Sequence, residues 1–175
     1  MSPTVLPRGA AIDLPAAERW TVAACWNRHA LCEVDVVAFA LCENGRVSRD
    51  EDFVFYGAAE TPDGTVRLAA RGPTEQAIVI DLTALPEAVR TVTIAAAIDG
   101  TVTFGDLGPV RLSAGPGDGE PAHAQATLDN GTTERTMLVA EVYRRGPRWR
   151  LRVVGQGYDF GLAGLARGFG VDVEG

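Results

Sequence analysis

The chain has 175 residues, 46% of them hydrophobic, and a formal net charge of −7. This length suits one domain, residues 1–175, with a well-buried core. The negative charge argues against general binding to nucleic acids or to anionic membranes, because both need a cationic surface.

The opening residues MSPTVLPRGA lack the apolar segment of a signal peptide, and no apolar run approaches the roughly 20 residues of a membrane-spanning helix. Cys25, Cys32 and Cys42 are an odd number without the spacing of a disulfide framework. We therefore expect a cytoplasmic protein with no transmembrane segment.

Short apolar segments separated by turn residues recur along the whole chain. After a short leading strand near Val5, we predict strands at 20–26, 34–42, 47–56, 65–70, 76–82, 91–98, 101–104, 110–113, 124–128, 136–143 and 149–154. A helical turn is predicted at 85–89, and a short C-terminal helix at 160–169, where apolar residues have helical spacing. Many short strands with turns every 8–12 residues or so are typical of an all-β sandwich or barrel.

Two features refine this arrangement. Asn44-Gly45 lies between apolar runs and predicts a hairpin, because both central turn residues need positive φ. Residues 34–42 are apolar on both faces, which is typical of a central strand.

Catalytic motifs are missing from the sequence. His29 and His123 are the only histidines, and neither has the spacing of a zinc hydrolase. There is no G-x-S-x-G segment, and the glycine-rich stretch 115–119 lacks the Lys-Ser/Thr ending of a phosphate loop. We therefore expect no enzymatic activity.

Acidic residues form a more informative group. Glu33 and Asp35 lie at i, i+2 and so share one face of a strand, while Asp50, Glu51 and Asp52 precede the strand that returns from the Asn44-Gly45 turn. If the acidic ends of the two strands meet, their oxygens can bind calcium, which takes six to eight oxygen ligands. The alternative is that they are solvated carboxylates at strand ends.

Arg148, Arg150 and Arg152 alternate with Trp149, Leu151 and Val153, so the arginines occupy one face of a strand. Such a row can hold a phosphate or an acidic partner. It can equally keep an edge strand soluble, with the charged stems covering apolar surface.

Several motifs along the chain together form a recognisable set. Near the C-terminus they are Val153-Val154-Gly155-Gln156-Gly157-Tyr158, Gly161-Leu162-Ala163 and the closing stretch 170–174. Further motifs occur at Glu141-Val142-Tyr143-Arg144 with Trp149, at Asp50, Asp52 and Phe53-Val54-Phe55-Tyr56, at Pro62-Asp63-Gly64, at Trp26, and at Phe104-Gly105. This set resembles the motifs of the TerD family of tellurium-resistance and stress-response proteins, in order and over nearly the whole chain.

The resemblance implies a two-sheet β-sandwich with short helical turns, in a cytoplasmic, non-enzymatic protein of the stress response. Family members bind calcium through acidic loops, but this chain departs from their pattern. The family's D-F-D-L-D is Leu31-Cys32-Glu33-Val34-Asp35 here, and its long acidic loop is shortened to residues 70–76, where only Glu75 is acidic and Arg71 adds a positive charge. Because calcium affinity follows the number of charged ligands, we expect binding that is weak or lost.

Three functions follow as hypotheses. The first is a non-catalytic binding or scaffold module that contacts other proteins, such as other Ter-type stress proteins or further copies of itself, with no bound cofactor. The second is a calcium sensor or buffer that retains one weak Ca²⁺ site formed by Glu33, Asp35, Asp50 and Asp52. The third is an enzyme acting on small anions at the Arg148, Arg150 and Arg152 face, for which the sequence offers no evident nucleophile or base.

Overall fold

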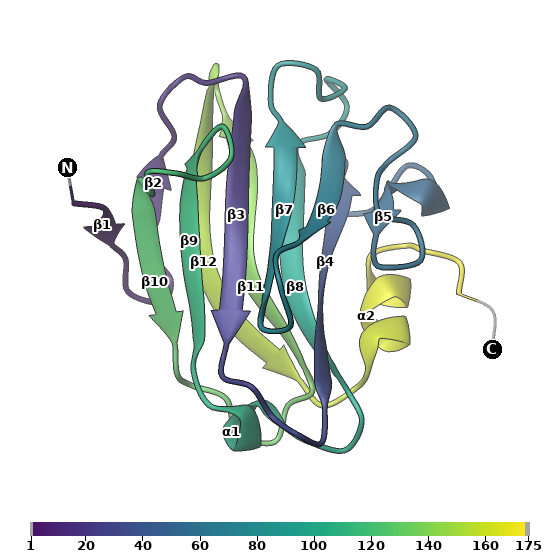
Figure 1. The fold of residues 1–175 in the computed structure, drawn as a ribbon. Helices are drawn as coiled ribbons and strands as arrows, with labels where there is room; N and C mark the ends of the chain where they lie inside the picture. Colours follow the sequence, from purple (N-terminus) through teal and green to yellow (C-terminus); the bar gives the residue numbers. More distant parts are fainter. Residues whose placement is uncertain (1, 174–175) are drawn as a thin grey trace.

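The computed structural model describes residues 2–173, which form a sandwich of two six-stranded sheets (Figure 1). Sheet A has the order β1-β10-β9-β3-β7-β6 and sheet B the order β2-β12-β11-β8-β4-β5. All pairings are antiparallel except that of β1 with β10. The expected all-β sandwich is confirmed.

The strands of sheet A are β1 (Thr4–Val5), β10 (Ala124–Leu128), β9 (Val110–Pro116), β3 (Arg19–Trp26), β7 (Glu75–Asp81) and β6 (Val66–Ala70). Those of sheet B are β2 (Ala11–Asp13), β12 (Arg148–Tyr158), β11 (Thr136–Arg145), β8 (Thr91–Asp99), β4 (Glu33–Leu41) and β5 (Phe53–Val54). The helices are η1 (Asp50–Asp52, a 3₁₀ turn), α1 (Phe104–Leu107) and α2 (Leu162–Gly168). Among the described residues, no helix is both long enough and apolar enough to cross a membrane.

The main core lies between the sheets. Alternate residues of each strand point inward, so that Val34, Val36 and Ala38 of β4 meet Ile78 and Ile80 of β7 in one buried cluster. Trp20 in β3 is completely buried, and its indole N–H donates to the Pro15 carbonyl, 3.2 Å away.

A second apolar cluster lies on the outer face of sheet B. Val37 and Phe39 of β4 point away from the main core and are covered by Leu165 and Ala166 of α2. Phe39 stacks on Phe53 with ring centroids 4.7 Å apart. This explains why residues 34–42 are apolar on both faces: one face belongs to the sandwich and the other to the helix, whose position beside β4 is visible in Figure 1.

The C-terminal segment also fastens the hairpin that follows β4. The Val47 amide donates to the Phe169 carbonyl at 2.9 Å, and the Asp172 amide donates to the Asp50 carboxylate at 3.0 Å. Part of the C-terminal signature therefore serves to hold the connection between β4 and β5, including η1, in place.

Two expected strands are different in the structure. Residues 101–104 were expected to be extended, but α1 begins at Phe104, because Thr103 and Asp106 form a reciprocal capping box. Residues 47–56 contribute only isolated bridges at Val47 and Phe55 and the two residues of β5, with η1 between Val47 and β5. In addition, β12 is not an edge strand, because β2 pairs with it.

Candidate functional site

Three carboxylates gather at the start of β4. Glu33 lies directly opposite Asp99 in the ladder between β4 and β8. Asp35 lies two residues further along β4, on the same outer face of sheet B. They line a cleft of about 650 Å³ together with Trp26, His29 and Gln76. Desolvation by burial, and then the charges of Asp99 and Glu33, raise the pKa of Asp35. The fold therefore disfavours the charged form of Asp35.

Gln76 forms one wall of that cleft and joins the two sheets. Its side-chain Oε1 accepts a hydrogen bond from the Val36 amide at 2.8 Å, and its Nε2 donates to the Val34 carbonyl at 3.3 Å. These backbone groups lie on the edge of β4 that β5 does not reach. The amide oxygen of Gln76 is thus already engaged by the backbone.

The expected meeting of the two acidic strand ends does not occur. Asp50 and Asp52 belong to η1, and the following Phe53 pairs with Phe39, six residues along β4 from Glu33. At about 3.3 Å per residue, the two groups are separated by about 20 Å. The prediction of a shared site was wrong because a segment only five to seven residues beyond the Asn44-Gly45 turn reaches the far half of β4, never its start.

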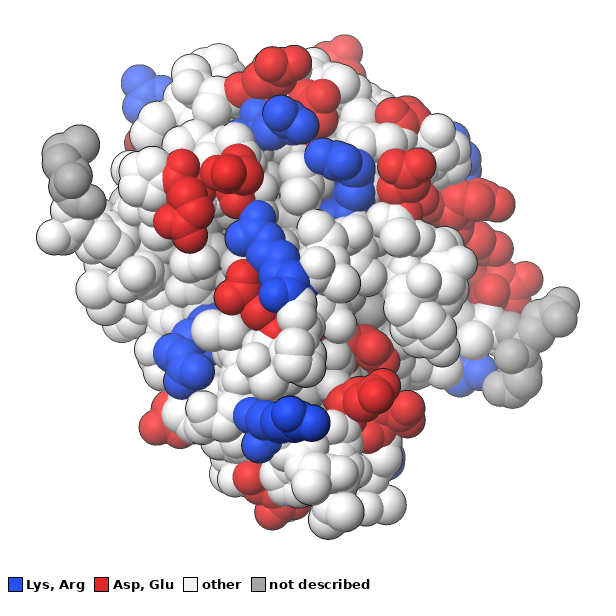
Figure 2. Space-filling model, viewed as in Figure 1, with Lys and Arg blue, Asp and Glu red and all other residues white. Residues whose placement is uncertain are grey.

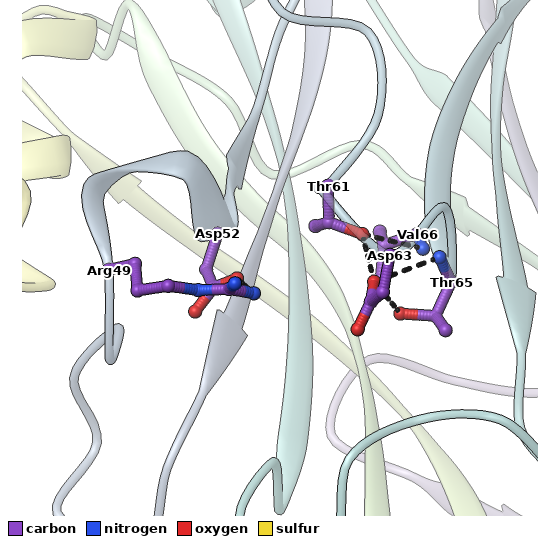
Figure 3. A network of polar contacts seen from close by, with 6 residues as sticks. All are labelled: Arg49, Asp52, Thr61, Asp63, Thr65 and Val66. Carbon is purple, nitrogen blue, oxygen red and sulfur yellow. Dashed lines mark hydrogen bonds and ion pairs between the residues drawn. The ribbon is translucent and has the colours of Figure 1, made fainter.

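Asp52 instead takes part in a separate polar network (Figure 3). It is only 4% exposed, and its Oδ1 accepts from Arg49 Nη2 at 2.9 Å. Figure 3 shows Arg49 extending toward the turn that carries Asp63. Asp63 Oδ1 accepts from the Thr61 and Thr65 hydroxyls at 2.8 and 2.7 Å and from the Thr65 amide at 3.1 Å.

Burial acts to raise the pKa of Asp63, but the hydrogen bonds from Thr65 and Thr61 and the charge of Arg49 outweigh it, so the pKa is lowered. One guanidinium therefore serves two carboxylates, one of them buried. The hydrogen bonds of Asp63 hold the Pro62-Asp63-Gly64 turn, and the charge of Arg49 balances this turn and η1, which is a structural role.

Glu75 lies in a third place. Strand alternation puts it on the outer face of sheet A, since its neighbour Gln76 points toward β4. Its carboxylate is 3.7 Å from Arg71 Nη1, and Arg71 also donates to the Asp118 carbonyl. The five acidic residues predicted as metal ligands thus occupy three separate sites.

Figure 2 shows the face of the molecule that sheet A forms, where acidic and basic side chains are interspersed. The predicted arginine row lies on the opposite sheet, on the outer face of β12. Asp13 of β2 lies beside it, with Oδ2 at 3.4 Å from Arg148 Nη1 and Oδ1 at 3.5 Å from Arg150 Nε. The guanidinium of Arg152 lies 5.1 Å from the centroid of the Tyr143 ring.

Comparison with known proteins agrees with this architecture. A family model described as the TerD domain matches residues 2–169. The chain belongs to the TerD family. It is 34% identical over 154 residues to the tellurium resistance protein TerD of Serratia marcescens, with 81% of this chain and 80% of that protein covered.

Two further likenesses extend the comparison. A chemical-damaging agent resistance protein B from Clostridium acetobutylicum is 28% identical, over 73% of this chain and 99% of its own length. The crystal structure of a homologue of the telluride resistance protein TerD from Streptomyces coelicolor A3(2) superposes with a TM-score of 0.65, covering 86% of this chain and 96% of that one, at 19% identity. This last likeness concerns the fold alone.

Sequence reasoning did not find three participants in these sites. Asp99 joins Glu33 only through the pairing of β4 with β8, strands some sixty residues apart in the chain. Asp13 reaches the arginines because β2 pairs with β12, and Gln76 meets β4 because the two sheets stack. None of these long-range pairings leaves a local signal in this TerD-family sequence.

Proposed function

We propose that this TerD-family protein is a non-enzymatic binding module of the stress response, in which the calcium site of the family is degenerate. Its membership of the family and its similarity to proteins named for resistance to tellurium and to chemical damage support the stress-response part. The dispersal of its acidic residues supports the loss of calcium binding.

That dispersal is the observation on which the proposal depends. Across residues 2–173, no three His, Cys, Asp or Glu side chains come close enough together to hold a metal ion. Glu33 and Asp35 lie on the outer face of sheet B, while Glu75 lies on that of sheet A. Calcium requires six to eight oxygens converging on one point, which these positions do not supply.

Arg71 supports the same proposal. It lies in the shortened loop, where its guanidinium is next to the Glu75 carboxylate. The same guanidinium donates a hydrogen bond to the carbonyl of Asp118, which belongs to a different loop. A permanent positive charge there performs the neutralising role that a cation has in an acidic loop. The loop is then held without metal.

Calorimetric titration of calcium into chelator-treated protein tests the metal part. We expect no binding tighter than about 1 mM, the weak end of known calcium modules, and an unchanged melting temperature in calcium. Micromolar binding with matching thermal stabilisation would refute the proposal. The variant Leu31→Asp restores the first acidic position of the family pattern at an exposed residue beside the cleft, and should bind calcium more tightly than the wild type.

A second candidate, a weak calcium buffer, is favoured by the proximity of Asp35 to the charges of Asp99 and Glu33 at the start of β4. Affinity purification from the native host, with and without calcium, separates the candidates. The binding module should retain the same partners in both conditions. Partners that are lost when calcium is chelated would favour the sensor or buffer.

A further inference from the structure

The outer face of sheet B is divided into two halves. Helix α2 covers the half formed by β4, β8 and β5, where Phe39 and Phe53 lie beneath it. Of the described residues of β11, β12 and β2, only Leu138 and Tyr158 pack against the apolar cluster beneath this helix, and they lie at the end of the two strands away from Arg148 and Arg150. Strand pairing arranges side chains of these three strands in two rows, Asp13–Arg150–Tyr143 and Ala11–Arg152–Glu141.

We define the arginine face as Arg148, Arg150 and Arg152, which lie on the part of β12 outside that cluster. Arg148 is 72% exposed, and Arg145 lies directly opposite it on β11. The acidic residues in the two rows are Asp13 and Glu141, so the four arginines leave the area positive. The chain as a whole has a net charge of −7, so this area is positive on a protein that is acidic overall.

Asp13 shows how a carboxylate fits between two of these arginines. One oxygen faces Arg148 and the other faces Arg150, at 3.4 and 3.5 Å. These distances exceed the 2.7–2.9 Å or so of a strong charge-assisted hydrogen bond. Arg150 Nε is buried, yet within the described residues it makes no hydrogen bond, because the approach of Asp13 lacks the required geometry. Asp13 therefore neutralises the pair only in part.

The aromatic side chain of Tyr143 holds Arg152 in one orientation. Its guanidinium packs over the Tyr143 ring, and its Nη2 donates to the Tyr143 hydroxyl at 3.3 Å. Stacking restricts this exposed side chain, while within residues 2–173 its other N–H groups have no hydrogen-bond acceptor from the protein. A planar guanidinium held in this way is suited to paired hydrogen bonds with a carboxylate.

We propose that the arginine face binds an extended acidic segment of a partner protein in which carboxylates occupy alternate positions. The three arginines follow one another at i, i+2 and i+4 along β12, about 7 Å apart per step. An extended peptide with Asp or Glu at every second residue repeats at the same interval. A single small anion fits less well, because the arginines form a line and do not converge on one point. This inference rests on the proposed function as a protein-binding module.

Fluorescence anisotropy with labelled peptides tests the proposal. The probe is a peptide in which Glu and Ser alternate, and its control has the same composition with all Glu residues consecutive. We expect the alternating peptide to bind more tightly, with an affinity that falls as salt is raised. Equal binding of both peptides, no binding of either, tighter binding of a single-stranded oligonucleotide, or full competition by inorganic phosphate would overturn the proposal.

Variants locate the binding. The double variant Arg148→Gln/Arg152→Gln should weaken binding at least about tenfold, because each arginine contributes charged hydrogen bonds. The matched control Arg67→Gln/Arg111→Gln removes two exposed strand arginines from sheet A and should leave the affinity unchanged. If both double variants lose affinity equally, the binding is non-specific and the assignment fails.

Asp13→Asn gives a change in the opposite direction. Removing the internal carboxylate frees Arg148 and Arg150, so the alternating peptide should bind more tightly, provided the urea midpoint shows that the variant is folded. Weaker binding by a folded variant contradicts the assignment.

A failure of this inference can be distinguished from a failure of the proposed function. If native partners still co-purify with the Arg148→Gln/Arg152→Gln variant, the chain remains a binding module and only the assignment to this face is wrong.

Discussion

Asp35 is a carboxylate whose environment works against its charged form. Burial and the neighbouring charges of Asp99 and Glu33 raise its pKa above the ordinary value of about 3.9. A raised pKa in the folded state means that folding favours the protonated acid. Asp35 therefore lowers stability at neutral pH, and this cost disappears as the pH falls through its folded pKa.

Replacing Asp35 by Asn should accordingly raise the melting temperature at pH 7. The gain should shrink as the pH is lowered and vanish below about pH 4, where the acid is protonated in both the folded and unfolded states. Thermal melts of the two proteins from pH 7 to pH 3 measure this. If calcium were a tight ligand, the same variant would instead be destabilised in calcium-containing buffer.

At the scale of elements, the glycines of the family signature set the shape of β12. The pairing of β11 with β12 shifts between Leu138 and Ala140, where β12 contains one extra residue. Gly155 lies in this bulge with φ of +74°, the left-handed region that favours glycine. A Cβ there would meet Arg8 Nε at 2.9 Å and Leu128 Cδ2 at 3.0 Å.

Gly155→Ala should therefore destabilise the protein by at least about 1–2 kcal/mol, which corresponds to a fall of about 2–8 °C in melting temperature for a chain of this size. Gly168→Ala is the matched control, because Gly168 ends α2 with open space around it and without a positive φ. That control should be neutral or slightly stabilising. Equal losses in both variants would rule out the bulge as the cause.

For the whole molecule, the closure of the sandwich beside β4 depends on Gln76. Its amide satisfies the Val36 N–H and the Val34 C=O, which no strand of the described chain pairs at this edge. Unpaired backbone groups near the core cost about 1–3 kcal/mol each. A single side chain thus links sheet A to the exposed edge of sheet B.

Gln76→Leu keeps the size of the side chain and removes both hydrogen bonds. We expect the free energy of unfolding in urea to fall by about 1–3 kcal/mol with an unchanged dependence on denaturant. Gln125→Leu on β10 is the control, because Gln125 is exposed and should tolerate the change. A loss of similar size at Gln125 would mean that the effect comes from added surface hydrophobicity.

The sequence by itself determined the local features of this protein. Alternating apolar residues placed most strands, and Asn44-Gly45 and Pro62-Asp63-Gly64 marked turns, because strand periodicity and turn geometry depend on neighbouring residues. The helical spacing of Leu162, Leu165 and Ala166 located α2. The motifs were also sufficient to identify the TerD family.

The tertiary structure alone decided which charged and polar groups meet. Asp35 with Asp99, Asp13 with Arg148, and Gln76 with Val36 are joined by pairings between distant strands and by the stacking of the sheets. The separation of Glu33 from Asp52 likewise follows from the register of β5 on β4. Register is set by the packing of whole strand faces. The residues next to a given residue in the sequence therefore do not identify its partner across the sheet.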